Sequence, residues 1–101
     1  MAMIVVLFNL KPGVAVADYE KFARETDLPI VNRLPSVNRF EVLKATGLLS
    51  GAPSPYQYIE LLDIKDLGQL GKDVATEQMQ KVAATFRSLA DNPQFIVTET
   101  L

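Results

Sequence analysis

Two residue types that carry much of enzyme chemistry are missing from this chain of 101 residues, which has no cysteine and no histidine. The lack of cysteine excludes disulfide bonds, thiolate catalysis and cysteine-based zinc sites. The lack of histidine removes the usual acid–base group of neutral pH, the Ser-His and Cys-His dyads, the proximal haem ligand and most zinc or iron sites. Proton chemistry must then use carboxylates, tyrosines, lysines or water. We expect an activity that needs no metal and no cofactor.

Charge and hydropathy exclude two further classes of partner. The 10 basic and 12 acidic residues are scattered and give a formal net charge of −2. No basic stripe that would bind a phosphate backbone is present, so we expect no nucleic-acid partner. No apolar run approaches the roughly 18 residues of a membrane span. The apolar start of the chain lacks a basic region and a cleavage site, which favours a strand over a signal peptide. We expect a cytoplasmic protein.

Turn-forming residues divide the chain, residues 1–101, into the elements of a single domain. β-Branched and aromatic runs predict four strands, at 3–10, 37–46, 56–64 and 95–101. Helical spacing of apolar residues predicts a helix from 17 to about 34, which Pro29 kinks or ends, and a short helix at 66–72. A longer helix is predicted from the N-cap Thr76 to Asn92-Pro93, and a loop at 47–55.

The element order β-α-β-β-α-β predicts an α+β fold of the ferredoxin-like kind, a four-stranded antiparallel sheet with both helices on one face. A generic α+β domain with another strand order is the alternative. The first and third strands are apolar on both faces, although two helices cover only one face. Because soluble monomers rarely leave so large an apolar surface in water, we expect a homodimer through the open sheet face. A monomer with a partly apolar open face is the alternative.

Two carboxylates are candidates for catalysis. Asp27 lies about two helical turns after Tyr19, on the buried stripe of the first helix. Burial there would raise its pKa and suit it to proton transfer; hydrogen bonding at a helix end is the alternative. Glu60 lies within an apolar strand, where carboxylates are uncommon. It either faces a cavity or forms an ion pair with Arg24 or Arg39.

Polar and aromatic residues form a candidate set for substrate binding. If the first and third strands are antiparallel neighbours, Asn9 lies near Tyr56 and Tyr58. Their amide and phenol groups would then bond a ligand at one end of a cavity. Asn9 would otherwise begin the turn that follows its strand. Tyr19 and Arg24 on the first helix complete the set, although helical spacing alone also explains Tyr19 as a core residue.

Several segments of the chain resemble the dimeric α/β-barrel superfamily, and the similarity covers essentially the whole sequence. They are residues 19–22 (YEKF), 26–29 (TDLP), 34–37 (LPSV), 56–60 (YQYIE) and 93–99 (PQFIVTE). Within the superfamily the chain is most similar to the REDY-like, or HapK-like, group. The resemblance implies a barrel dimer with a cavity between sheet and helices in each subunit. Many members carry a His-x-Pro motif, and this chain has Asp27-Leu28-Pro29 at the corresponding place. The resemblance therefore implies no histidine or haem chemistry here, and the difference agrees with the REDY-like pattern.

Members of the superfamily include cofactor-free monooxygenases, polyketide cyclases, haem-degrading enzymes and effector-sensing domains, so the fold alone leaves the function open. The REDY-like resemblance implies a protein that binds a small apolar or aromatic metabolite in secondary metabolism, in a prodigiosin-type pathway. There it would act as a cofactor-free cyclase, condensation helper or monooxygenase, or as an accessory factor. A non-catalytic ligand-sensing or scaffold homodimer is the alternative.

Overall fold

In the computed structural model, which describes residues 2–101, the strands form one antiparallel sheet in the order β2-β3-β1-β4. The strands are β1 (Ala2–Leu10), β2 (Val37–Lys44), β3 (Tyr58–Ile64) and β4 (Ala90–Glu99). The two most apolar strands, β1 and β3, take the central positions, where both of their edges are paired. The predicted ferredoxin-like fold is therefore confirmed, and the apolar start of the chain forms a central strand.

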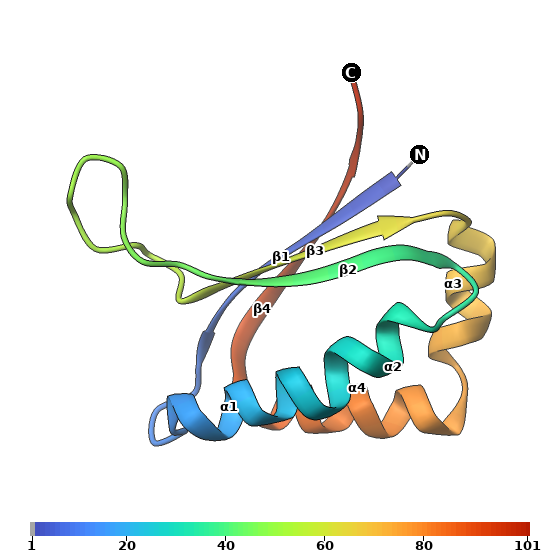
Figure 1. Ribbon diagram of the computed structural model, residues 1–101, viewed down its shortest axis with the longest axis horizontal. Helices are drawn as coiled ribbons and strands as arrows, with labels where there is room; N and C mark the ends of the chain where they lie inside the picture. Colours follow the sequence, from blue (N-terminus) through green and yellow to red (C-terminus); the bar gives the residue numbers. More distant parts are fainter. Residues whose placement is uncertain (1) are drawn as a thin grey trace.

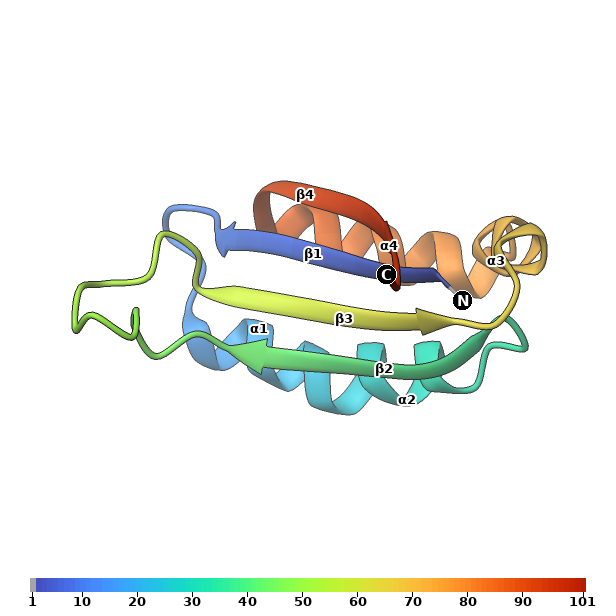
Figure 2. The same cartoon turned by 90° about the horizontal axis from the view of Figure 1, so that it is seen from above.

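The helices cover one face of the sheet and leave the other open (Figures 1 and 2). The first helical stretch consists of α1 (Val16–Phe22), the π-helical turn η1 (Ala23–Asp27) and α2 (Leu28–Asn32). The second consists of α3 (Leu67–Val74) at one end of the sheet and α4 (Glu77–Leu89). Among residues 2–101, no helix has the length and apolarity to cross a membrane.

The first helical stretch is interrupted just before Pro29, the residue at which the sequence predicts that the helix kinks or ends. Leu28 donates its backbone N–H to the carbonyl of Ala23, five residues back, which makes the turn ahead of it π-helical. Pro29 supplies the physical reason, because it has no N–H to donate and its ring clashes with the carbonyl four residues back. A wider turn directly before the proline relieves that clash, and the chain continues as a helix to Asn32.

The core lies between the sheet and the helices. Val6, Phe8 and Tyr58 point to the helices and are at most 2% exposed. The ring of Phe8 packs edge-on against Tyr19 and Phe86, with ring centroids 5.4 and 5.0 Å apart, and stacks on Tyr58 at 5.6 Å. Aromatic pairs in these geometries add about 0.5–1.5 kcal/mol each beyond the burial of area. Phe8 therefore joins the sheet to both helical stretches.

The open face of the sheet carries an apolar strip across its centre. Val5 pairs with Leu61 on one side and with Ile96 on the other. Side chains alternate between faces along a strand, so these three residues share the face opposite to the buried Val6. Ile96 is 44% exposed and Met3, on the same face, is 38% exposed. This apolar strip agrees with the sequence-based prediction that the first and third strands, β1 and β3, are apolar on both faces.

The last strand begins earlier than the sequence predicts. The fourth helix ends at Leu89 and β4 starts directly at Ala90, whereas the prediction ends the helix at Asn92-Pro93 and starts the strand at residue 95. The ladder with β1 is irregular between Leu7 and Asn9, and Asn92 has a φ of +45°. Pro93 is tolerated in β4 because β4 is an edge strand and its pairing with β1 has a bulge at this point.

The other element ends differ little from the sequence-based ones. The β2–β3 connection spans residues 45–57 and protrudes beyond the sheet (Figure 1), so it is longer than the predicted loop at 47–55. The side chain of Asp66 caps α3 by accepting from Gly68 and Gln69 N–H. The predicted N-cap Thr76 accepts from the Met79 N–H at 3.3 Å. Both caps satisfy N–H groups that the first turn of a helix leaves free.

Candidate functional site

A cavity of about 210 Å³ lies between the sheet and the helices. All four strands and the helices α2, α3 and α4 contribute apolar side chains to its walls. They include Ile4 of β1, Val31 of α2, Phe40 of β2, Leu70 of α3, Val82 and Phe86 of α4, and Phe95 of β4. The two titratable residues in the lining are Asp27 and Glu60. The structure thus brings the two predicted catalytic carboxylates to one apolar space.

Asp27 is held in the cavity wall by the end of the π-helical turn. It is 5% exposed and lies on the buried side of the helix with Tyr19, as its spacing in the sequence predicts. Within residues 2–101 its carboxyl group has no hydrogen-bond or ion-pair partner. Burial disfavours the charged form and raises the pKa of Asp27 from 3.8 to about 6. The group is therefore close to its titration point at neutral pH, as a general acid or base must be.

Glu60 enters the same cavity from β3. It is 5% exposed, and its ladder partners are Val6 and Val42. Burial, together with repulsion from Asp27, raises the pKa of Glu60 from 4.5 to about 8. The hydrogen bond donated by the Tyr19 hydroxyl, at 3.5 Å, offsets a part of this increase. Glu60 consequently keeps its proton at neutral pH.

The predicted ion pair between Glu60 and an arginine is wrong. Arg24 pairs with Glu20, four residues earlier on the same helix, at 3.3 Å. Arg39 pairs with Glu41, on its own strand, at 2.9 Å. The physical reason is geometric. Glu60 points from the sheet toward the helices, whereas both arginine side chains lie at the surface and are more than 70% exposed. The other alternative from the sequence, a Glu60 that faces a cavity, is the observed one.

Tyr19 connects Glu60 of the cavity to a second, smaller pocket of about 110 Å³. It is fully buried, and its ring lies 4.7 Å from that of Tyr58 between centroids. Burial, with repulsion from Glu60 and Asp27, raises the pKa of Tyr19 far above its ordinary value. Its hydroxyl therefore acts as a fixed hydrogen-bond donor to Glu60 rather than as an acid.

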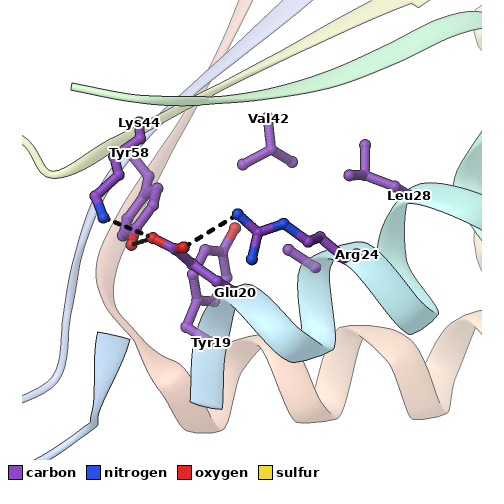
Figure 3. Close-up of a pocket in the computed structure, with 8 residues that line it drawn as sticks. Tyr19, Glu20, Arg24, Leu28, Val42, Lys44 and Tyr58 are labelled. Atoms are coloured by element: carbon purple, nitrogen blue, oxygen red, sulfur yellow. Dashed lines mark hydrogen bonds and ion pairs between the residues drawn. The ribbon is translucent and has the colours of Figure 1, made fainter. Parts of the chain in front are cut away.

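The smaller pocket is organised by Glu20, which the sequence did not single out (Figure 3). Its carboxylate accepts a hydrogen bond from the Tyr58 hydroxyl at 2.7 Å and pairs with Lys44 at 2.9 Å and with Arg24 at 3.3 Å. The bonds from Tyr58 and Lys44 lower the pKa of Glu20. Burial and the bond to Glu20 raise the pKa of Tyr58. Only the i,i+4 spacing to Arg24 could have indicated Glu20 from the sequence.

Asn9 and Tyr56 lie apart from both pockets, at the base of the long loop. The Asn9 amide donates to the Pro55 carbonyl at 3.1 Å and accepts from the Gln57 N–H at 2.9 Å. The backbone of Tyr56 is held by the Ser54 hydroxyl. Asn9 therefore does lie near the start of β3, as predicted, but its amide bonds the main chain of the loop. Among the predicted substrate-binding residues, Tyr19, Arg24 and Tyr58 are the ones that line a pocket.

Clusters of possible metal ligands are absent from the part of the chain that the structure describes. No group of three or more histidine, cysteine, aspartate or glutamate side chains is arranged there to hold a metal ion. The chemistry available at the cavity is that of two carboxyl groups in apolar surroundings. Such groups can transfer protons and can bind hydrogen-bond donors or cations.

The fold and the cavity together define a ferredoxin-like α+β protein with a small-molecule-sized apolar cavity beneath its sheet. The chain belongs to the REDY-like HapK family, which matches residues 2–101. A comparison with curated protein sequences gives no match.

Solved structures share this fold over nearly the full chain. HapK from Hahella chejuensis is 26% identical, with a TM-score of 0.82, over 100% of this chain and 93% of HapK. SnoaB, a cofactor-independent oxygenase from Streptomyces nogalater, is 16% identical, with a TM-score of 0.78, over 99% of this chain and 92% of SnoaB. A dimeric protein of ferredoxin-like fold from Bacteroides fragilis is 11% identical, with a TM-score of 0.73, over 98% and 95%. At these identities the last two similarities concern the fold alone.

Proposed function

We propose that the protein is a homodimeric, cofactor-free enzyme of secondary metabolism that transfers a proton on a small, largely apolar or aromatic metabolite. Asp27 carries the proposal, because it is a buried carboxyl group without a partner among residues 2–101 and it lines an apolar cavity. An unpaired buried carboxyl group costs free energy. A role toward a bound ligand accounts for that cost.

The two carboxyl groups take opposite parts in the proposed reaction. At neutral pH Asp27 is mostly ionised and Glu60 is protonated, since their pKa values are about 6 and about 8. Pairs of titratable groups whose surroundings separate their pKa values in this way act as base and acid. Asp27 removes a proton from the metabolite, Glu60 donates its proton to the oxygen where negative charge develops, and exchange with water resets both. A cyclase, a condensation helper and a cofactor-free monooxygenase share such a deprotonation.

One of the predicted substrate-binding residues supports this pair directly, because Tyr19 positions Glu60 through its hydroxyl. Tyr58 and Arg24 bind Glu20 in the smaller pocket, which Tyr19 also lines. A direct contact of Asn9 or Tyr56 with the metabolite stays a prediction, since neither residue lines the cavity.

The proposed homodimer pairs the open sheet faces of two copies. The apolar strip on that face, with Val5, Leu61 and Ile96, would lose its contact with water in such a dimer. The protein of the same fold from Bacteroides fragilis is dimeric, which supports a dimer without specifying its interface. A prodigiosin-type pathway and a cytoplasmic location are further parts of the proposal, and they rest on membership of the REDY-like family and on the sequence.

Gene disruption in the producing organism tests the proposed function. Disruption should remove a secondary metabolite from the extract profile measured by mass spectrometry, and the wild-type gene should restore it. A gene that encodes Asp27→Asn should fail to restore it, while the protein accumulates to a normal level. The matched control is Glu25→Gln, since Glu25 lies on the same helical turn but is exposed.

Two results would overturn the proposal. An unchanged metabolite profile after disruption would contradict a role in secondary metabolism. Full restoration by Asp27→Asn would contradict proton transfer by Asp27 and would favour the non-catalytic sensing or scaffold dimer.

A further inference from the structure

The titratable residues in the lining of the cavity are all acidic. Its lining residues within the described chain are apolar except for Asp27 and Glu60, both of which are acidic. Each is only 5% exposed, so water compensates little of the charge. The Asp27 carboxyl group is the unpartnered member of the pair, since Glu60 has the hydroxyl of Tyr19. The cavity therefore offers an anion for which the described chain supplies no countercharge.

The basic residues of the smaller pocket already form ion pairs with another carboxylate. Arg24 and Lys44 line the smaller pocket and both bind Glu20, at 3.3 and 2.9 Å. Figure 3 shows the two side chains turned toward that carboxylate from opposite sides. Glu20 is thus neutralised twice while Asp27 is not neutralised at all.

The charge of the cavity at neutral pH follows from the groups that face it. Tyr19 faces Glu60 from α1, and the residues that α3, α4, β1, β2 and β4 contribute to the lining are apolar. The pKa of Asp27 is about 6 and that of Glu60 is about 8. Asp27 is therefore mostly ionised and Glu60 neutral, which leaves a single negative charge on the pair.

We propose that the cavity takes a small apolar or aromatic ligand with one basic nitrogen, bound as its cation against the Asp27 carboxylate. This inference rests on the proposed function, because it names the ligand class of the same site. A protonated amine supplies both the countercharge and the N–H donors that Asp27 lacks. Hydrogen bonds between two charged partners are about twice as strong as neutral ones, and apolar surroundings strengthen them further. A neutral alcohol lacks the charge, and a carboxylate ligand is repelled.

The size of the cavity limits the ligand to about one ring. Its volume of about 210 Å³ is below the roughly 300–1,000 Å³ of sites for drug-sized ligands. The walls, with Val31, Val82 and Phe86, suit a ring or a short branched chain rather than a second polar group. Benzylamine has the required size and charge.

The experiment compares benzylamine with benzyl alcohol and benzoate, which have similar shapes and different charges. Each is titrated into the purified full-length protein, and binding is followed by NMR through the methyl groups of Leu62, Leu70 and Val82, which line the cavity. The titrations are repeated at about pH 5 and with three variants. These are Asp27→Asn, Glu60→Gln and the exposed control Glu25→Gln.

We expect benzylamine to bind about tenfold tighter than benzyl alcohol at neutral pH, with benzoate the weakest. The preference should decrease about tenfold per pH unit below the pKa of Asp27, because protonation removes the anion. It should disappear in Asp27→Asn and persist in Glu60→Gln and Glu25→Gln. If Asp27→Asn fails to fold, the loss of preference at about pH 5 in the wild-type protein still supports the assignment.

The outcomes separate this inference from the proposed function. Equal binding of benzylamine and benzyl alcohol at the cavity methyl groups would overturn the cation preference and leave the small-molecule site standing. Tighter binding of benzoate, or a preference for benzylamine that persists in Asp27→Asn, would also overturn it. If none of the three compounds shifts the cavity resonances, the inference fails together with the small-molecule site itself.

Discussion

Replacing Asp27 by asparagine should stabilise the protein at neutral pH. The substitution keeps the shape of the side chain and removes its charge. In the unfolded chain an aspartate ionises near its ordinary pKa of 3.8, whereas in the folded protein Asp27 ionises only near pH 6. The folded state therefore holds a proton that the unfolded state has lost throughout this interval. By linkage, the free energy of unfolding of the wild-type protein decreases as the pH rises from about 4 to about 6.

The two pKa values give the size of the effect. The stability lost by ionising Asp27 is about 3 kcal/mol once the pH exceeds the folded pKa. This is a large share of the roughly 5–15 kcal/mol that stabilises a typical domain. An asparagine side chain cannot ionise, so the variant should be more stable than the wild type by about 3 kcal/mol at neutral pH. Near pH 4 Asp27 is neutral in the folded state, and the difference should almost vanish.

Urea denaturation across this pH range measures the difference. The chain has no tryptophan, so far-UV circular dichroism is the suitable signal, and the protein concentration must be fixed because a dimer links stability to concentration. The exposed control Glu25→Gln should show no comparable pH-dependent gain. Stabilisation by loss of a buried charge is the pattern expected when a group is retained for function at the expense of stability.

The opposite result would refute this reasoning. If Asp27→Asn is less stable than the wild type at neutral pH, the Asp27 carboxylate makes a favourable interaction that the structure does not contain. If the stability difference is the same at pH 4 and pH 7, Asp27 ionises normally in the folded protein. Either result would remove the basis for acid–base chemistry at this position.

Three further predictions concern the open face, the core and a helix cap. Leu61→Lys places a charge in the apolar strip and should convert the proposed dimer to a folded monomer in light scattering; an unchanged mass would contradict the proposed interface. Phe8→Ala should cost about 3–5 kcal/mol in denaturation, because the buried ring contacts three other rings; a loss below about 1 kcal/mol would contradict that packing. Thr76→Ala should cost about 1 kcal/mol and Thr76→Ser should restore most of it, whereas equal loss in both variants would show that the hydroxyl is not the cap.

The sequence predicted the fold because its signals are local. The β-branched and aromatic runs of β1 and β3 and the helical spacing in the two helical stretches depend on neighbours a few residues away. Thr76 could be recognised as an N-cap for the same reason. The spacing from Tyr19 to Asp27 placed both on the buried side of the helix, where the structure has them.

The features that the sequence missed depend on contacts between distant segments or on backbone detail. Pro29 predicts a kink or an end of the first helix, but it does not predict that the interruption takes the form of a π-helical turn. The early start of β4 requires pairing with β1 to override a proline. Glu20 gathers Lys44 and Tyr58 from other elements, so only the fold reveals it. The cavity between sheet and helices was expected only from the family resemblance, because the packing that sets it is encoded by no local pattern.

A carbon-13 NMR titration of the side-chain carboxyl groups tests the central claim most directly, namely that an apolar cavity holds two carboxyl groups poised for proton transfer. We predict that Asp27 titrates near pH 6 and Glu60 near pH 8. We also predict that the Glu60 titration moves to lower pH in Asp27→Asn, because the repulsion is gone. Titration of both groups near their ordinary values of 3.8 and 4.5 would contradict the account.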